Sequence, residues 1–228
     1  MTRTVIFNAD DFGAAPGINR GIVHCHTAGV LTSTSLMVDA VAAEDAARLG
    51  RAHPALAVGL HWALDGTRAP APDFGDPGAV RAELERQLAT AARLLGRPPT
   101  HLDSHHHVHR DPEVLPHALV IAERTGLALR GSSAVHYIGG FYAQWEPGVD
   151  ELEHVSVAAL ASILKNELAG GWTEIGCHPG FVEDDFRSAY REPREAELAT
   201  LTDPAVRVLL EDLGLHLASF AEVRSAPA

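Results

Sequence analysis

The sequence predicts an α/β fold whose mostly parallel strands close into a barrel. Short apolar runs alternate with stretches of helical periodicity along the whole chain, which is the pattern of successive strand–helix units. A length of 228 residues suits one such barrel, and 46% hydrophobic residues can supply its core. Neither an internal repeat nor a low-complexity segment divides the chain. We therefore expect residues 1–228 to form a single domain.

The expected strands are short apolar segments bounded by polar or turn residues. They cover residues 4–7, 35–38, 57–61, 101–104, 128–130 and 173–177. Helices are expected between them. Pro16 opens one that ends at Gly29, and an alanine-rich helix lies near 41–51. Segment 131–150 is Gly-rich and aromatic, which predicts a long loop of the kind that often carries function.

Three further helices share one opening, an aspartate followed by proline. The aspartate can cap the helix, and proline is favoured at the first helical position. Apolar residues then recur at helical spacing until a glycine stops each helix. The three openings are Asp76-Pro77, Asp111-Pro112 and Asp203-Pro204.

Composition restricts the partners of the chain. A net charge of −12 and the lack of a Lys/Arg run argue against nucleic acid and anionic membranes. The two cysteines, Cys25 and Cys177, are far apart in sequence and form no metal-binding pair, which suits a reducing compartment. The N-terminus does not resemble a signal peptide, and no apolar run is long enough for a membrane span. We expect a cytoplasmic protein that acts on a neutral or cationic small molecule.

Polar residues gather where the expected strands end. Asp10 and Asp11 end the first strand, His61 ends the 57–61 strand, and His178 follows the 173–177 strand. A histidine cluster ends the 101–104 strand. Because the carboxyl ends of parallel strands meet on one face, we expect these groups to form one site. A lone histidine such as His61 would more often be a core residue. It becomes a candidate site residue only because the other polar groups are expected on the same face.

The segment HLDSHHHVH, residues 101–109, is the densest of these clusters, since five of its nine residues are histidines. Neutral imidazole is the commonest metal ligand in proteins. If the strand continues, alternation puts every second residue on one side. Only one or two of these can bind one ion, and the others surround the ligands or face solvent. The alternative is an exposed histidine-rich loop without metal. The alternating set is His101, Asp103, His105, His107 and His109.

The adjacent acids Asp10 and Asp11 suit a division of labour. One would bind the metal and the other would accept a proton from the attacking water. The alternative is that one of them only caps the following helix. His178 lies in the turn CHPG, where it could act as a general acid or be a turn residue without chemistry. Cys177 should point to the opposite side, into the core.

Several motifs carry a resemblance to the YdjC-like carbohydrate deacetylase family, which includes diacetylchitobiose deacetylases and a hopanoid-associated branch. The match extends over nearly the whole chain, and the histidine block is its most specific part. The motifs are NADDFG at 8–13, PGINRGI at 16–22, LTSTSLMV at 31–38, AVGLH at 57–61, PTHLDSHHHVH at 99–109, CHPGFV at 177–182 and SAYREPREAELATLT at 188–202.

The resemblance implies a distorted (β/α) barrel related to the polysaccharide deacetylases, and a homodimer. It also implies metal-dependent hydrolysis of the N-acetyl group of an amino-sugar or short chito-oligosaccharide. Asp103 and His107 would then support the ligands. Carried onto this sequence, the implied metal ligands are Asp11, His61 and His105, the implied base is Asp10, and the implied general acid is His178.

One carboxylate and two imidazoles leave open positions on a metal, as catalytic sites require. Nitrogen ligands favour Zn²⁺, although Mg²⁺ also fits the resemblance. A metal-dependent phosphoesterase is an alternative, but it would need a second carboxylate-rich ligand set and a basic phosphate cradle. A non-catalytic sugar-binding protein is another alternative, which an intact Asp10 disfavours.

An aromatic cluster in the expected loop is our candidate for sugar binding. Tyr137, Phe141, Tyr142 and Trp145 lie within nine positions of a chain that has 13 aromatic residues in all. Aromatic faces commonly pack on sugars, so we expect Tyr142 or Trp145 to stack on the substrate and Arg130 to contact it. Equally, the loop could pack against the barrel or a partner subunit.

Overall fold

The computed structural model describes residues 3–66, 69–146, 148–183, 186 and 188–223. Seven parallel strands form a nearly closed barrel in the order β5-β4-β3-β2-β1-β7-β6, and the short β8 pairs with the start of β1. The strands are β1 (Arg3–Phe12), β2 (Ser33–Leu36), β3 (Ala57–Trp62), β4 (His101–Ser104), β5 (Ala128–Leu129), β6 (Val135–Ile138), β7 (Gly171–Cys177) and β8 (His216–Leu217).

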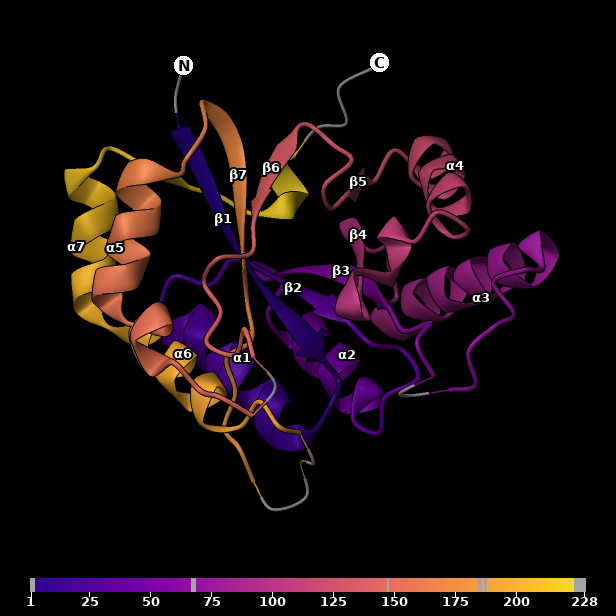
Figure 1. The fold of residues 1–228 in the computed structure, drawn as a ribbon, viewed down its shortest axis with the longest axis horizontal. Helices are drawn as coiled ribbons and strands as arrows, with labels where there is room; N and C mark the ends of the chain where they lie inside the picture. The colour runs from indigo at the N-terminus through magenta and orange to yellow at the C-terminus, as the bar shows by residue number, and fades with distance from the viewer. Residues whose placement is uncertain (1–2, 67–68, 147, 184–185, 187, 224–228) are drawn as a thin grey trace.

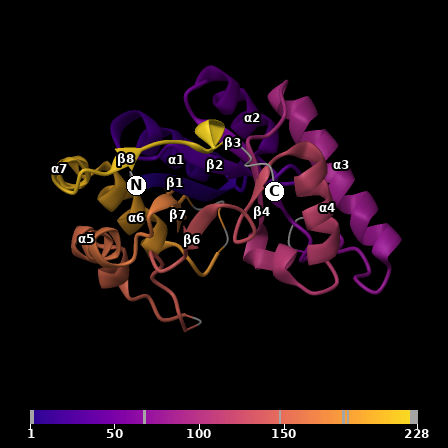
Figure 2. The ribbon, with the colours of Figure 1, turned by 90° about the horizontal axis from the view of Figure 1, so that it is seen from above.

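Helices surround the strands (Figures 1 and 2). On one side of the barrel α3 packs beside α4, and on the opposite side α5 packs beside α7. No helix in the described part of the chain is both long and apolar enough to cross a membrane. The α-helices are α1 (Pro16–Ala28), α2 (Ala43–Ala52), α3 (Pro77–Leu95), α4 (Leu115–Thr125), α5 (Val157–Asn166), α6 (Glu192–Thr202) and α7 (Pro204–Asp212), and the short 3₁₀ helices are η1 (His105–Arg110), η2 (Leu152–Val155) and η3 (Phe220–Glu222).

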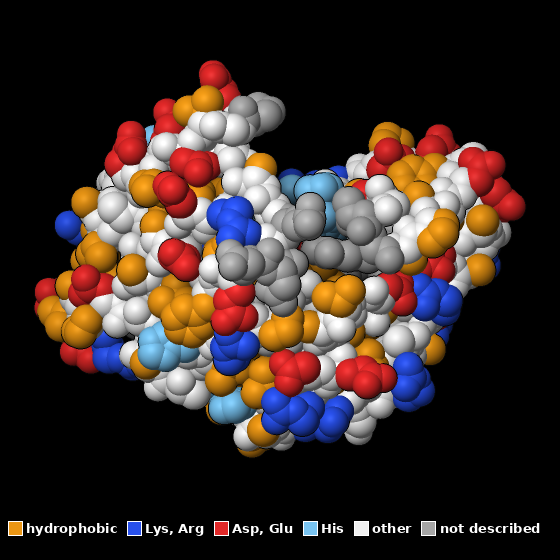
Figure 3. Space-filling view, turned by 90° about the horizontal axis from the view of Figure 1, so that it is seen from below, with side chains coloured by type: hydrophobic (Ala, Val, Ile, Leu, Met, Phe, Trp, Pro, Cys, Tyr) orange, Lys and Arg blue, Asp and Glu red, His pale blue; other side chains and the backbone are white. Residues whose placement is uncertain are grey.

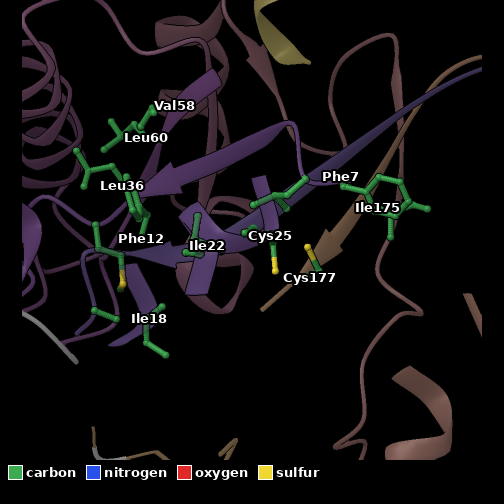
Figure 4. Close-up of a cluster of buried hydrophobic side chains, with 14 of the residues drawn as sticks. Phe7, Phe12, Ile18, Ile22, Cys25, Leu36, Val58, Leu60, Ile175 and Cys177 are labelled. Atoms are coloured by element: carbon green, nitrogen blue, oxygen red, sulfur yellow. The ribbon is translucent and has the colours of Figure 1, made fainter. Parts of the chain in front are cut away.

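One large apolar core lies between the strands and the helices on the outside of the barrel (Figure 4). Phe7 and Phe12 of β1 and Ile18 and Ile22 of α1 are fully buried in it. Cys177 is also buried there as a free thiol, which confirms that it is a core residue. The burial of these side chains fixes the position of β1, which carries both acids of the candidate site.

The Asp-Pro openings give helices in two of the three expected places. The carboxylates of Asp76 and Asp203 accept hydrogen bonds from backbone N–H groups of the first turns of α3 and α7. At Asp111 the prediction was wrong by about one turn, because α4 begins only at Leu115. Asp111 instead accepts from the Glu113 N–H in a tight turn that precedes the helix.

Two further expectations differ from the structure. Segment 131–150 is not wholly a loop, because β6 (Val135–Ile138) lies within it and pairs with β7. Strand β4 ends at Ser104, so the strand-like alternation does not extend through His105 to His109. There the chain enters η1, where His106 and His107 adopt left-handed φ values of 50° and 54°.

Side chains join the two ends of the sheet, which are β5 and β6. Arg130 follows β5 directly, and its guanidinium reaches Glu174 of β7 and Asp10 of β1. It also lies 4.7 Å from the centre of the Tyr137 ring of β6. Charged and aromatic side chains therefore bridge the seam where the strand order ends.

Candidate active site

A pocket of about 490 Å³ lies at the carboxyl ends of the strands. Figure 3 looks onto the molecule from this side, and histidine side chains are visible in a notch of the surface. The strand-end groups expected from the sequence do meet here. The pocket lining includes Asp10, Asp11, His61, His105, Tyr137, Tyr142, Trp145, His178, Tyr190 and Arg194.

A bulge in β1 brings both adjacent acids into the pocket. In a regular strand, successive side chains point to opposite faces. Between Ala9 and Phe12, however, the register of β1 against β2 shifts, and Asp11 adopts a left-handed φ of 67°. Such strain in a residue other than glycine is commonest at functional sites. The following helix is capped by Ala15 without any side-chain hydrogen bond, so the capping interpretation of the two acids is wrong.

The carboxylate of Asp11 faces two imidazoles across a small gap, the candidate metal gap. The Oδ1 atom of Asp11 lies 3.6 Å from His61 Nε2 and 3.8 Å from His105 Nε2. In a tetrahedral zinc site with bonds of 2.0–2.1 Å, donor atoms stand roughly 3.3 Å apart. Asp11 Oδ1 is buried and accepts no hydrogen bond from any described residue. The distance from Asp11 Oδ1 to each imidazole nitrogen is therefore close to that between two ligands of one divalent ion.

Carboxylates hold the far side of both imidazoles. The Nδ1 atom of His61 lies 2.7 Å from Asp103 Oδ1, and that of His105 lies 2.6 Å from Asp65 Oδ2. Burial alone would lower the pKa of His61, but Asp103 and Asp10 outweigh it and raise that pKa to about 9. The negative potential that holds a proton on His61 equally favours a metal cation in this gap. Asp65 was not among the residues singled out from the sequence.

Asp11 is held by a residue that sequence reasoning missed. Arg194 of α6 forms an ion pair with Asp11 Oδ2, which leaves Oδ1 to face the histidines. The same guanidinium donates to the backbone carbonyl of His178 over 3.2 Å. Burial raises the pKa of Asp11, but Arg194 and the nearby histidines lower it by more. The pKa of Asp11 is therefore below its usual range. Asp11 is therefore a carboxylate at neutral pH.

Asp10 is held by a bidentate ion pair. Its two carboxylate oxygens accept from Nη1 and Nη2 of Arg130, both over 2.7 Å. Burial raises the pKa of Asp10, but Arg130 and His61 outweigh burial and lower it. We expected Arg130 to contact the substrate. The structure instead buries its side chain to 1% exposure beneath Asp10, where it also pairs with Asp103 and Glu174.

His178 lies beside Asp10 at the edge of the pocket. Its Nε2 atom is 3.8 Å from Asp10 Oδ2, and its side chain is 23% exposed. Burial lowers the pKa of His178 to about 4, despite the opposing effect of Asp10 and Asp11. Behind it, the buried Glu197 of α6 accepts from the His178 backbone N–H and from the Tyr190 hydroxyl. Burial raises the pKa of Glu197 to about 8.

The remaining histidines of the 101–109 segment do not join the metal gap. His101 is buried away from the pocket and stacks on Phe220 at 3.9 Å between ring centres. His107 Nε2 lies 3.5 Å from the Tyr137 hydroxyl, so it contacts the aromatic lining. His109 is buried between Ser104 and the carbonyl of Arg130. The strand-like alternation fails here because the chain turns after Ser104.

The aromatic cluster divides between the pocket and the core. Tyr142 and Trp145 line the pocket, with their rings 5.5 Å apart and nearly perpendicular, whereas Phe141 is fully buried in the core. Tyr142 also stacks flat on Tyr190, at 4.6 Å between ring centres. Trp145 is 57% exposed, so its face is open to a ligand.

Solved structures share this architecture. The polysaccharide deacetylase of Bacillus cereus superimposes with a TM-score of 0.57 at 13% identity, covering 96% of this chain and 93% of that one, which shows a common fold. A structure from Enterococcus faecalis V583, named for cellobiose-phosphate cleavage, superimposes with a TM-score of 0.81 at 26% identity, covering 98% and 100%. The protein thus has the (β/α) barrel fold of these structures.

Sequence comparison is more specific. A family model described as YdjC-like protein matches residues 4–212. A chitooligosaccharide deacetylase of Serratia marcescens is 32% identical, with 98% of this chain and 100% of that protein covered. A carbohydrate deacetylase of Geobacillus stearothermophilus is 34% identical, with 97% and 98% covered. The chain belongs to the YdjC-like family, as the sequence motifs predicted.

Proposed function

We propose that this protein is a metal-dependent carbohydrate deacetylase that hydrolyses the N-acetyl group of an amino-sugar or short chito-oligosaccharide. The observation that carries the proposal is the buried Oδ1 of Asp11, which accepts no hydrogen bond from any described residue and faces two imidazole nitrogens, with Asp10 and His178 beside them. The names of the relatives favour sugar deacetylation over phosphoester hydrolysis. A pure sugar-binding protein would need no paired acid and histidine next to a metal gap.

Asp11, His61 and His105 would hold the divalent ion, and two imidazole ligands favour Zn²⁺ over Mg²⁺. Once bound, such an ion polarises the acetamide carbonyl and lowers the pKa of a water molecule. Arg194 keeps Asp11 charged and turned toward the gap. Asp103 and Asp65 would accept the Nδ1 protons of His61 and His105 as hydrogen bonds, which leaves the Nε2 lone pair of each imidazole for the ion.

Asp10 is the proposed base. It removes one proton from the water whose oxygen attacks the acetamide carbon. Arg130 fixes its carboxylate by the bidentate pair and keeps it deprotonated, so it is ready to accept this proton. We accordingly assign Arg130 a positioning role beneath Asp10 instead of a substrate contact.

His178 is the proposed acid, and it must receive its proton during the reaction. With a pKa of about 4 it is neutral at pH 7, so it has no proton to spare at the start. Asp10 carries the proton from water after the attack and lies 3.8 Å away. Transfer of this proton to His178 would return Asp10 to the carboxylate form that Arg130 holds. His178 then protonates the sugar nitrogen as its bond to the acetyl carbon breaks, which gives acetate and a free amine.

Hydrolysis assays test the proposal directly. The zinc-loaded protein should release acetate from N-acetylated chito-oligosaccharides, and the chelated protein should not. A parallel assay with sugar phosphates and aryl phosphates covers the phosphoesterase alternative. Release of phosphate without acetate, or no turnover of any acetylated sugar by fully loaded protein, would contradict a deacetylase.

Trp145 and Tyr142 are the proposed sugar platform. We expect Trp145→Ala to raise KM about threefold to tenfold, which corresponds to the 0.5–1.5 kcal/mol of an aromatic contact. Metal content should remain unchanged because Trp145 contacts none of the proposed ligands in the described structure. Steady-state kinetics on a chito-oligosaccharide measure the effect, and Trp145→Phe should restore part of it. Unchanged kinetics in Trp145→Ala and Tyr142→Ala would make the segment structural.

A further inference from the structure

We propose that Asp65 is a positioning residue for the metal site: it fixes the tautomer and direction of the His105 imidazole. Asp65 lies just after β3, the strand that carries His61. The end of β3 therefore supplies one proposed ligand and the partner that orients another. The inference rests on the proposed role of His105 as a metal ligand, and the experiment below separates the two.

The contact geometry supports this role. The distance of 2.6 Å between His105 Nδ1 and Asp65 Oδ2 is short, as expected for an imidazole N–H that donates to a carboxylate. A proton on Nδ1 leaves the lone pair on Nε2, and Nε2 faces Asp11 Oδ1 across the metal gap. Side-chain exposure is only 13% for Asp65 and 16% for His105, so little water competes for the contact.

Asp65 does for His105 what Asp103 does for His61, but from a different position in the fold. Asp103 is fully buried in the barrel, where Arg130 also holds it. Asp65 instead lies on the connection between β3 and α3, beside the pocket-lining His105. There its carboxylate contacts the proposed ligand His105 directly, over 2.6 Å.

The turn after β4 presents a second histidine to the same oxygen. His106 Nδ1 also lies 2.6 Å from Asp65 Oδ2, and its ring packs on that of His105 at 3.8 Å between centres. His106 and His107 both adopt left-handed φ values in this turn, which carry backbone strain. His106 is 65% exposed, so its own contact with Asp65 is weakened by solvent.

Direct zinc titration of the metal-free protein tests the proposal without relying on activity. Asp65→Ala should raise the dissociation constant about 10- to 100-fold, the usual effect of removing a carboxylate that orients a ligand histidine. The ¹⁵N shifts of the His105 ring in the metal-free protein should change from a dominant Nδ1–H tautomer to a mixture. Unaltered zinc affinity in Asp65→Ala would overturn the proposal.

Two control variants separate positioning from other effects. Asp73→Ala removes one negative charge from the same β3–α3 connection, where the Asp73 carboxylate accepts from the nearby Gly75 N–H. It should bind zinc like the parent protein. His106→Ala removes one contact of Asp65 but keeps its contact with His105, and it should also retain affinity. If His106→Ala weakened zinc binding as much as Asp65→Ala, Asp65 would act by holding the turn at His106 and not by orienting His105, and the proposal would fail.

His105→Ala distinguishes this inference from the metal assignment itself. Full zinc affinity in His105→Ala would mean that His105 is no ligand, and both would fall. Loss of affinity in His105→Ala but not in Asp65→Ala would leave the metal site standing and refute only the role of Asp65. Thermal unfolding of each metal-free variant confirms that the comparison is made between folded proteins.

Discussion

Asp10→Asn should lower kcat by about 10²-fold or more while zinc remains bound. Asparagine keeps the shape of the side chain and can accept one hydrogen bond from Arg130, but it cannot take a proton from water. Metal should be retained because the proposed ligand is the adjacent Asp11, whose Oδ1 faces His61 and His105. Acetate release under saturating substrate, together with metal analysis of the same sample, measures both quantities.

A second variant excludes a general disturbance around Arg130. Glu174→Gln alters another buried partner of that guanidinium and leaves Asp10 intact. Burial raises the pKa of Glu174 to about 7, so its charge is already partly lost at neutral pH and the change should be mild. Comparable losses of kcat in the two variants would point to the ion-pair network. Loss of zinc from Asp10→Asn would indicate that Asp10 is the metal ligand and Asp11 the base.

His105→Ala should lose most of the bound zinc, with affinity reduced by about 10²-fold or more, because a three-residue set becomes a two-residue set. Binding stabilises the folded state by an amount that grows with the logarithm of the ratio of free zinc to its dissociation constant, so zinc should raise the Tm of the parent protein strongly and that of the variant little. Metal analysis after dialysis gives the same answer independently. A variant that kept its full zinc content would show that another group completes the site.

The residues found from sequence are those at the ends of regular strands. Asp10, Asp11, His61 and His178 could be grouped because parallel strands end on one face, whatever the details of packing. His105 was grouped with them on the same basis, although it lies one residue past the end of β4. The prediction that strand alternation continues through the histidine run was wrong. The left-handed turn could not be foreseen, because the run contains no glycine or asparagine to signal it.

The missed residues reach the site from helices and loops. Arg194 and Glu197 lie on α6 at a spacing that puts both on its buried face, with Leu201. Charged residues on the apolar face of a helix are rarely buried without partners, and this was the available signal. Asp65 gave no such signal, because a single acid in a loop is ordinary. Its proposed role comes from its contact with His105, which follows β4 and is distant in sequence.

The seam between β5 and β6 bears on how the pocket can change over evolutionary time. These strands are the two ends of the barrel sheet, and the groups between them are the side chains of Arg130, Tyr137 and Arg110, whose guanidinium also lies 5.3 Å from the Tyr137 ring. Tyr137 and Arg110 line the pocket as well. Exchanging these two residues would reshape one wall for a larger or smaller substrate without breaking a strand pairing. The acids and the proposed metal-binding histidines lie on the paired strands or directly beside them, so the pocket wall can diversify while the proposed reaction centre is preserved.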